Sequence, residues 1–159
     1  MSETQIEQTI KVKGSFRLNI MNPEGTKIVG DSGWVENLVT NLGFNEYLVS
    51  ALGSIAGSKY ISHVGLGTGT APGAAATTLD GEVGTRQGVT AATTTGSKTL
   101  RITATFAAGW HTSASAHNIS NIGLFNSSSG GTLFAGTTYA SSSCASNQAV
   151  NVTYSIIFS

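Results

Sequence analysis

At 159 residues the chain has the length of one ordinary domain, long enough to bury a core and too short for two comfortable domains. Charged residues make up 10% of the chain, against about 25% in typical soluble proteins, and eight basic residues balance eight acidic ones. The basic residues are scattered without interleaved aromatic residues, so we expect no nucleic-acid partner, which would need clustered positive charge.

The sequence also lacks the usual marks of export and membrane insertion. Its first nine residues, MSETQIEQT, have neither the basic start nor the apolar run of a signal peptide. No apolar stretch approaches the roughly 20 residues that span a bilayer, so we expect a soluble protein with no membrane partner. Cys144 is the single cysteine, which excludes an internal disulfide. A surface of small neutral groups gives little charge repulsion between neighbouring molecules and suits a permanent assembly.

The first part of the chain predicts a flexible arm followed by a hairpin. Residues 1–9 are polar and show no periodicity, so we expect an N-terminal arm that stays loose or lies over a neighbour. From Ile10 the pattern alternates and places Phe16, Leu18 and Ile20 on one face of a strand. A turn is expected at residues 22–25, which contain Pro and Gly, and a return strand at residues 27–29.

One segment has helical periodicity. Apolar residues recur at spacings near three and four from Leu38 to Leu52. Gly43 weakens the pattern, so we expect the helix to run from about Asn45 to Leu52 and to stop at Gly53. Its apolar face should cover one edge or end of a sheet.

The remaining elements are expected to be strands joined by Gly-, Thr- and Ser-rich turns. The loop at residues 67–81 is long for a compact domain, and we expect it to contact a partner. In the last strand Val150, Val152, Tyr154, Ile156 and Phe158 should point inward. The strands are predicted at residues 60–66, 83–92, 100–106, 118–125, 132–139 and 150–158, with a hairpin loop at 95–97 and a turn at 126–131.

Many short strands, regularly spaced turns and one helix predict the fold class. We expect a mainly β protein, an antiparallel β-sandwich of about eight strands with one short helix. The domain organisation would be a flexible arm at residues 1–9 and a single β-sandwich domain at residues 10–159.

Residues with chemical potential do not form an enzyme pattern. The run GLGTGT at residues 65–70 has its third glycine in the wrong place for a dinucleotide fingerprint, and no helix is expected after it. His63, His111 and His117 come without clustered cysteines or carboxylates, so a metal site would need an unusual constellation. Aspartates are few, and no nucleophile elbow surrounds any serine. We therefore predict no catalytic, cofactor-binding or metal residues, no cofactor and no enzymatic activity.

Two residue types leave alternatives open. Cys144 has no basic neighbour that would lower its pKa, so we expect an inert small residue. Trp34 and Trp110 could each be an interface anchor or a core residue.

Three segments in their order resemble a pattern found in small tailed-phage virion proteins and in the head-proximal domains of tail-collar fibre proteins. The first is GWVENLVTN at residues 33–41, before the helix. The second is VGLGTGTAP at residues 64–72, continuing to Leu79, Glu82 and Arg86. The third is the stretch from Ile119 to Phe125 with GTLFA at residues 131–135. The family pattern often carries an acidic residue before Ile-Gly-Leu, where this chain has Asn121.

The resemblance implies a structural role on the exterior of a tailed-phage virion. A capsid decoration protein and a small tail or collar attachment protein both fit a single domain. The expected partners are copies of the chain itself, in a homo-oligomer, and major capsid or tail proteins, and the expected location is the virion, assembled in the host cytoplasm. The alternative is a carbohydrate-binding module for host recognition that uses exposed Trp34, Trp110, Tyr60 or Tyr139.

Overall fold

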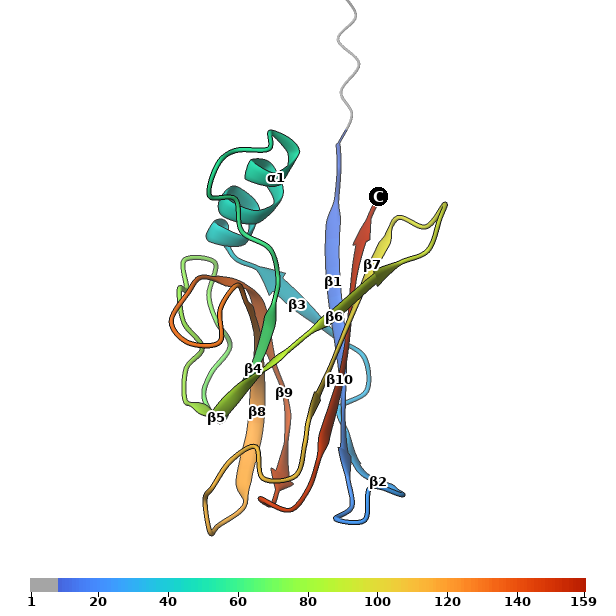
Figure 1. The fold of residues 1–159 in the computed structure, drawn as a ribbon, viewed down its shortest axis with the longest axis vertical. Coiled ribbons are helices and arrows are strands. Elements are labelled where there is room, and N and C mark those ends of the chain that lie inside the picture. Colours follow the sequence, from blue (N-terminus) through green and yellow to red (C-terminus); the bar gives the residue numbers. More distant parts are fainter. Residues whose placement is uncertain (1–8) are drawn as a thin grey trace, which may run out of the picture.

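The computed structural model describes residues 9–159 and shows a mainly β, antiparallel fold with one short helical segment, as predicted (Figure 1). The predicted arm at residues 1–9 lies outside the described residues except for Thr9. No helix in residues 9–159 has the length and apolar character that crossing a membrane requires. The strands are β1 (Val12–Met21), β2 (Ile28–Asp31), β3 (Val35–Val39), β4 (His63–Gly67), β5 (Glu82–Gly88), β6 (Thr90–Thr93), β7 (Thr99–Phe106), β8 (His117–Phe125), β9 (Leu133–Cys144) and β10 (Val150–Phe158).

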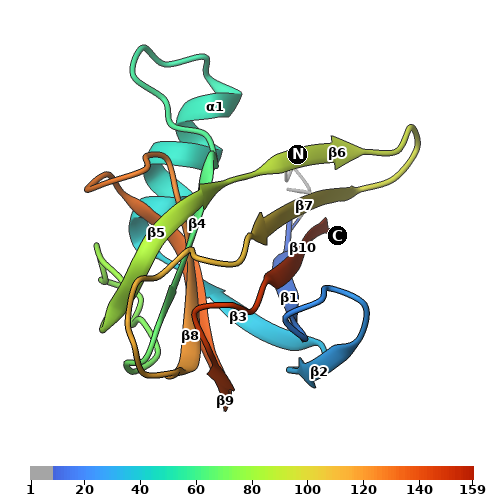
Figure 2. The same cartoon turned by 60° about the horizontal axis from the view of Figure 1, so that its bottom comes forward.

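The strands form two layers that are joined at both sides. One layer has the order β5-β4-β8-β9-β3, and the other has the order β3-β1-β10-β7-β6, with β2 paired to β1. β3 belongs to both layers, because its residues 35–37 pair with β1 and its residues 38–39 pair with β9. At the other side the chain runs from β5 directly into β6 (Figure 2). The result is a nearly closed sandwich.

The predicted strand at residues 83–92 is in fact two strands in different layers. β5 pairs with β4, whereas β6 pairs with β7. The break falls at Val89, whose backbone N–H donates to the Ser62 carbonyl at 3.0 Å. The alternation of small residues gives no sign of this change of partner.

The core lies between the two layers and follows the predicted alternation. Val150, Val152, Tyr154 and Ile156 of β10 are buried, and Phe158 is half-buried at the end of the strand. β1 pairs with β10 along its length. Phe16 of β1 packs against the rings of Tyr139 and Tyr154, with centroids 5.4 and 6.5 Å away. Aromatic and branched side chains from both layers therefore fill the interior.

The helical segment begins earlier than predicted. It consists of π-helical turns (η1, Gly43–Val49) followed by one α-helical turn (α1, Ser50–Leu52), and it ends before Gly53 as expected. The prediction that Gly43 precedes the helix is wrong. A Cβ at position 43 would collide with the carbonyl oxygen of Phe134, so the glycine lets η1 approach β9 closely. Tyr47 packs against Phe134, with ring centroids 5.1 Å apart, and donates its hydroxyl to the Thr132 carbonyl.

Candidate functional site

The Gly/Thr loop at residues 68–81 is held against the molecule by polar contacts. The side-chain amide of the buried Asn121 donates to the carbonyls of Thr70 and Asp80, at 3.0 and 2.7 Å. The Asp80 carboxylate accepts from the backbone N–H and the hydroxyl of Thr70, at 2.9 and 3.0 Å. These hydrogen bonds lower the pKa of Asp80. The expectation that this loop contacts a partner stays a prediction. The hydrogen bonds described above hold the loop against the rest of the domain.

Asn121 suits this position for a chemical reason. Its side-chain amide points two N–H donors at two carbonyl oxygens. An ionised carboxylate has no donor and would face those oxygens with like charge. In this chain the amide is therefore part of the fold.

Arg86 on β5 makes a second set of polar contacts within the molecule. Its guanidinium makes two bonds to the Glu82 carboxylate, at 2.6 and 2.9 Å, and donates to the carbonyls of Ser127 and Gly130. The same group lies 3.4 Å from the ring centroid of Phe125. Arg86 is 7% exposed, so this is a nearly buried charge with satisfied donors. The motif residues thus brace the turn between β8 and β9.

Two of the three histidines lie next to each other at the N-terminal end of β8, which begins at His117. The rings of His111 and His117 are 4.8 Å apart, and His117 is the register partner of Cys144 on β9. Burial, and secondly His117, lower the pKa of His111, while burial raises the pKa of the Cys144 thiol. His63 lies elsewhere, with its Nδ1 atom 2.8 Å from the Ser62 hydroxyl. Sequence spacing gave no sign that His111 meets His117.

This histidine cluster does not present a metal-binding arrangement. In the part of the chain that the structure describes, no three His, Cys, Asp or Glu side chains are grouped to hold a metal ion. Both ring nitrogens of His111 are buried without a hydrogen-bond partner among these residues. The two imidazole rings pack against each other beside Cys144, and the raised pKa of the Cys144 thiol disfavours a reactive thiolate.

The structure separates the aromatic residues whose roles were open. Trp110 is buried and packs against Phe106, with ring centroids 5.1 Å apart, so it is a core residue. Tyr139 is also buried, and burial raises its pKa. Trp34 and Tyr60 are 55% and 75% exposed. Two of the four aromatic residues considered for sugar binding are therefore inaccessible.

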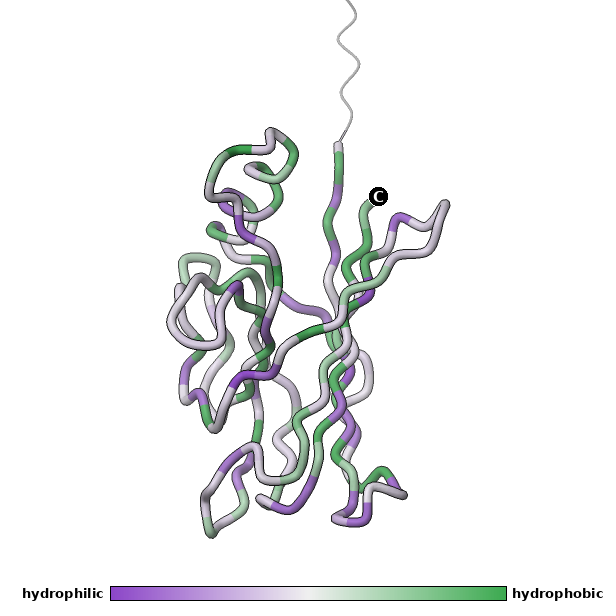
Figure 3. The backbone as a smooth tube through the Cα atoms, viewed as in Figure 1, coloured by the Kyte–Doolittle hydropathy of each residue, from purple (hydrophilic) through white to green (hydrophobic). Residues whose placement is uncertain are grey.

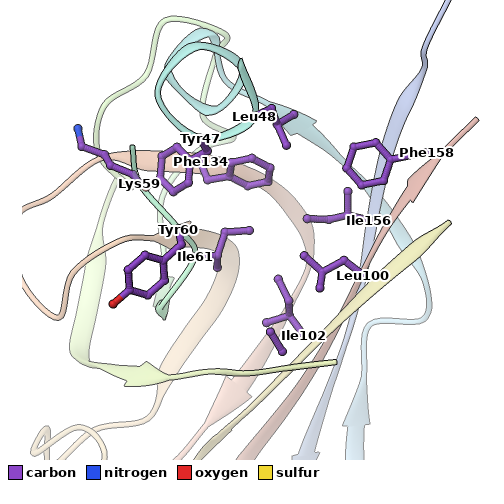
Figure 4. A pocket seen from close by; sticks show the side chains of 11 residues that line it. Tyr47, Leu48, Lys59, Tyr60, Ile61, Leu100, Ile102, Phe134, Ile156 and Phe158 are labelled. Atoms are coloured by element: carbon purple, nitrogen blue, oxygen red, sulfur yellow. The ribbon is translucent and has the colours of Figure 1, made fainter. Parts of the chain in front are cut away.

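An apolar cavity of about 270 Å³ opens between the two layers, next to the helical segment (Figure 4). Tyr47, Leu48 and Phe134 contribute from one side, and Ile156 and Phe158 of β10 from the other. At its rim, Lys59 and Tyr60 direct their polar atoms away from the apolar lining (Figure 4). Lys59 forms an ion pair with Glu46, which lowers the pKa of Glu46. The cavity is thus apolar inside, and its charged neighbour is already paired.

A second and larger hollow, of about 490 Å³, adjoins this cavity. The two share Leu48 and Phe158. Hydrophobic residues alternate with hydrophilic ones along the helical segment and the start of β1 (Figure 3). We refer to the surface around this hollow as the apolar end; it is formed by Ile10, Phe44, Leu48, Val49, Leu52 and Phe158.

At the apolar end, large apolar side chains are in contact with solvent. Leu52 is 90% exposed, Ile10 75% and Val49 60%. The periodicity of the sequence placed Leu52 on the covered face of the helix, and this detail is wrong because the helical segment covers the sheet mainly through Tyr47 and Leu48. The apolar residues that it does not bury form the surface that sequence reasoning missed.

Comparison with known proteins finds no matching protein family, no matching curated protein and no matching solved structure.

Proposed function

We propose that this protein is a non-enzymatic structural component of the exterior of a tailed-phage virion, and that it attaches through the apolar end. The proposal covers two locations, a capsid decoration protein and a small tail or collar attachment protein. Both roles require a stable domain with a surface that is covered on assembly.

The apolar end is the observation that carries the proposal. Three of its side chains, Ile10, Val49 and Leu52, are each more than half exposed and surround one hollow. Contiguous apolar patches beyond a few hundred Å² are rare on free monomers and mark interaction sites. The lining is aliphatic and aromatic, which suits a protein partner better than a sugar or a nucleotide.

The resembling motifs support the proposal in a second way. Asn121 and Arg86 are occupied by contacts within the molecule, so the motif residues stabilise a scaffold. This is what a virion component needs, since its work is to hold shape and contact neighbours. The low charge of the chain also reduces repulsion between closely packed copies.

The test is incorporation into particles. We expect the protein to be found in purified virions, and the copy number from a quantified gel to separate the two locations: hundreds of copies indicate decoration, and a dozen or fewer indicate the tail. The variant Leu52→Glu should fold and fail to incorporate. Val29→Glu is the matched control, because Val29 is 53% exposed on β2, at the end of the molecule away from the helix (Figure 1).

Two results would overturn the proposal. One is absence of the protein from purified particles. The other is normal incorporation of Leu52→Glu. Binding to a glycan array through Trp34 or Tyr60, without particle association, would favour the carbohydrate-binding alternative.

A further inference from the structure

The charges of this chain are divided unequally between its first eight residues and the rest. All eight basic residues lie in residues 9–159, whereas two of the eight acidic residues, Glu3 and Glu7, lie in residues 1–8. The N-terminal segment is therefore acidic in its side chains. Its apolar residue Ile6 stands directly beside Glu7.

The apolar end has the opposite charge at its rim. Lys98 lines a shallow hollow together with Ile10 and Phe158 of the apolar end. Its backbone is tied to that end, because the Phe158 N–H donates to the Lys98 carbonyl at 2.9 Å. Within residues 9–159 Lys98 takes part in no ion pair, so its charge is available to an acidic ligand.

The N-terminal segment and the apolar end are thus complementary in two respects. Ile6 supplies an apolar side chain for the hollow of about 490 Å³. Glu3 and Glu7 supply carboxylates for the positive charge of Lys98. Such pairs at a rim contribute mainly to orientation and association rate, while the buried apolar contact contributes most of the affinity.

The direction of β1 favours binding between two copies over binding within one. Both backbone groups of Lys11 are hydrogen-bonded to Ser159, at 2.6 and 2.9 Å, so the strand pairing extends to this residue. A return of residues 1–8 into their own hollow would need a chain reversal immediately before Ile10. Residues 6–9, which directly precede Ile10, contain no Gly, Pro, Asn, Asp or Ser, the residues that most favour such reversals. Fully extended, eight residues reach up to about 26–29 Å, which is enough to reach a neighbouring molecule.

We infer that residues 1–8 of one copy bind the apolar end of a second copy, with Ile6 in the hollow and the carboxylates of Glu3 and Glu7 near Lys98. The exchange links copies through an apolar contact with a charged rim. It does not depend on the virion role, because it concerns the purified chain alone.

The experiment measures self-association of the full chain by sedimentation velocity over a range of concentrations. Ile6→Asp should raise the dissociation constant at least tenfold, because it places a charge in the hollow. Gln5→Ser is the matched control in the same segment and should associate like the unaltered chain. Equal thermal unfolding midpoints would show that the folded domain is unchanged.

Charge reversal tests whether the contact joins two molecules. A chain with Glu3→Lys and Glu7→Lys, and a second chain with Lys98→Glu, should each associate more weakly alone. Mixing the two should restore association, because each N-terminal segment then faces an apolar end of opposite charge. The inference is overturned if the unaltered chain is monomeric at high micromolar concentration, if Ile6→Asp associates normally, or if mixing restores nothing.

Discussion

On the side of the sandwich formed by β4, β5 and β8, polar side chains form hydrogen bonds with other parts of the same molecule. Asn121 holds the Gly/Thr loop, and Arg86 holds the β8–β9 turn. At the apolar end the opposite holds, because large apolar side chains such as Leu52 and Ile10 contact solvent. The contrast teaches that the residues of the resembling motifs secure the fold, while the surface that suits a partner lies outside most of them. Substitutions on the two sides should therefore have separable effects on stability and assembly.

Arg86→Ala should produce the largest loss of stability. It removes the bonds to Glu82, Ser127 and Gly130 and the contact with Phe125, from a side chain that is 7% exposed. We expect the free energy of unfolding to fall by about 3 kcal/mol, since breaking a nearly buried ion pair leaves groups unpaired. Chemical denaturation measures it.

Arg17→Ala is the control for Arg86→Ala. Arg17 also pairs with a carboxylate, that of Asp31, but its side chain is 42% exposed. The expected loss is much smaller than that for Arg86→Ala, because solvent screens an exposed ion pair. Equal losses for the two variants would contradict the structural role given to Arg86.

Asn121→Asp should cost about 2 kcal/mol near pH 7, because an ionised carboxylate would face the carbonyls of Thr70 and Asp80 without donors. The folded state would raise the pKa of this new carboxyl above the unfolded value of about 3.9. The unfolded state then binds fewer protons, so the deficit relative to Asn121 should shrink as pH falls toward 4. Denaturation at several pH values checks it; a deficit independent of pH would contradict this account.

His111 is a second buried polar side chain. Its ring nitrogens, unlike the side-chain amide nitrogen of Asn121, have no hydrogen-bond partner among the described residues. The pKa of His111 is lowered by burial and by His117. An imidazole in the unfolded chain binds a proton near pH 6.5, and folded His111 does so only at lower pH. Stability should therefore fall as pH drops below about 6.5, by at most about 1.4 kcal/mol per pH unit for this group.

His111→Phe tests this dependence. The variant should show a flatter decline of the unfolding free energy between about pH 7 and pH 5 than the unaltered chain, since one proton-linked group is removed. An unchanged slope would show that His111 does not govern the acid response.

Leu52→Glu should have the smallest effect on stability, within about 0.5 kcal/mol, because Leu52 is 90% exposed. The same substitution should have the largest effect on assembly. Thermal unfolding and particle incorporation, measured on one preparation, would separate the two effects. A large loss of stability would show that the apolar end is part of the core.

The sequence predicted the fold class, but it did not predict the apolar end. Alternation identified β1 and β10 because their side chains face core and solvent in turn. Periodicity could not reveal that β5 and β6 lie in different layers, which depends on a backbone contact at Val89. The exposure of Leu52 and the burial of Trp110 also depend on tertiary packing, to which helical spacing and residue type are blind.

The double membership of β3 has a consequence for how this protein can associate. Because β3 joins the two layers at one side and the chain crosses from β5 to β6 at the other, the strands at the margins are β5, β6 and the side strand β2. β2 and β6 have four residues each, and β5 has seven. Short edges such as β2 and β6 protect a sheet protein from uncontrolled strand-to-strand aggregation. A domain built this way can be concentrated in an ordered assembly while its copies keep their separate folds.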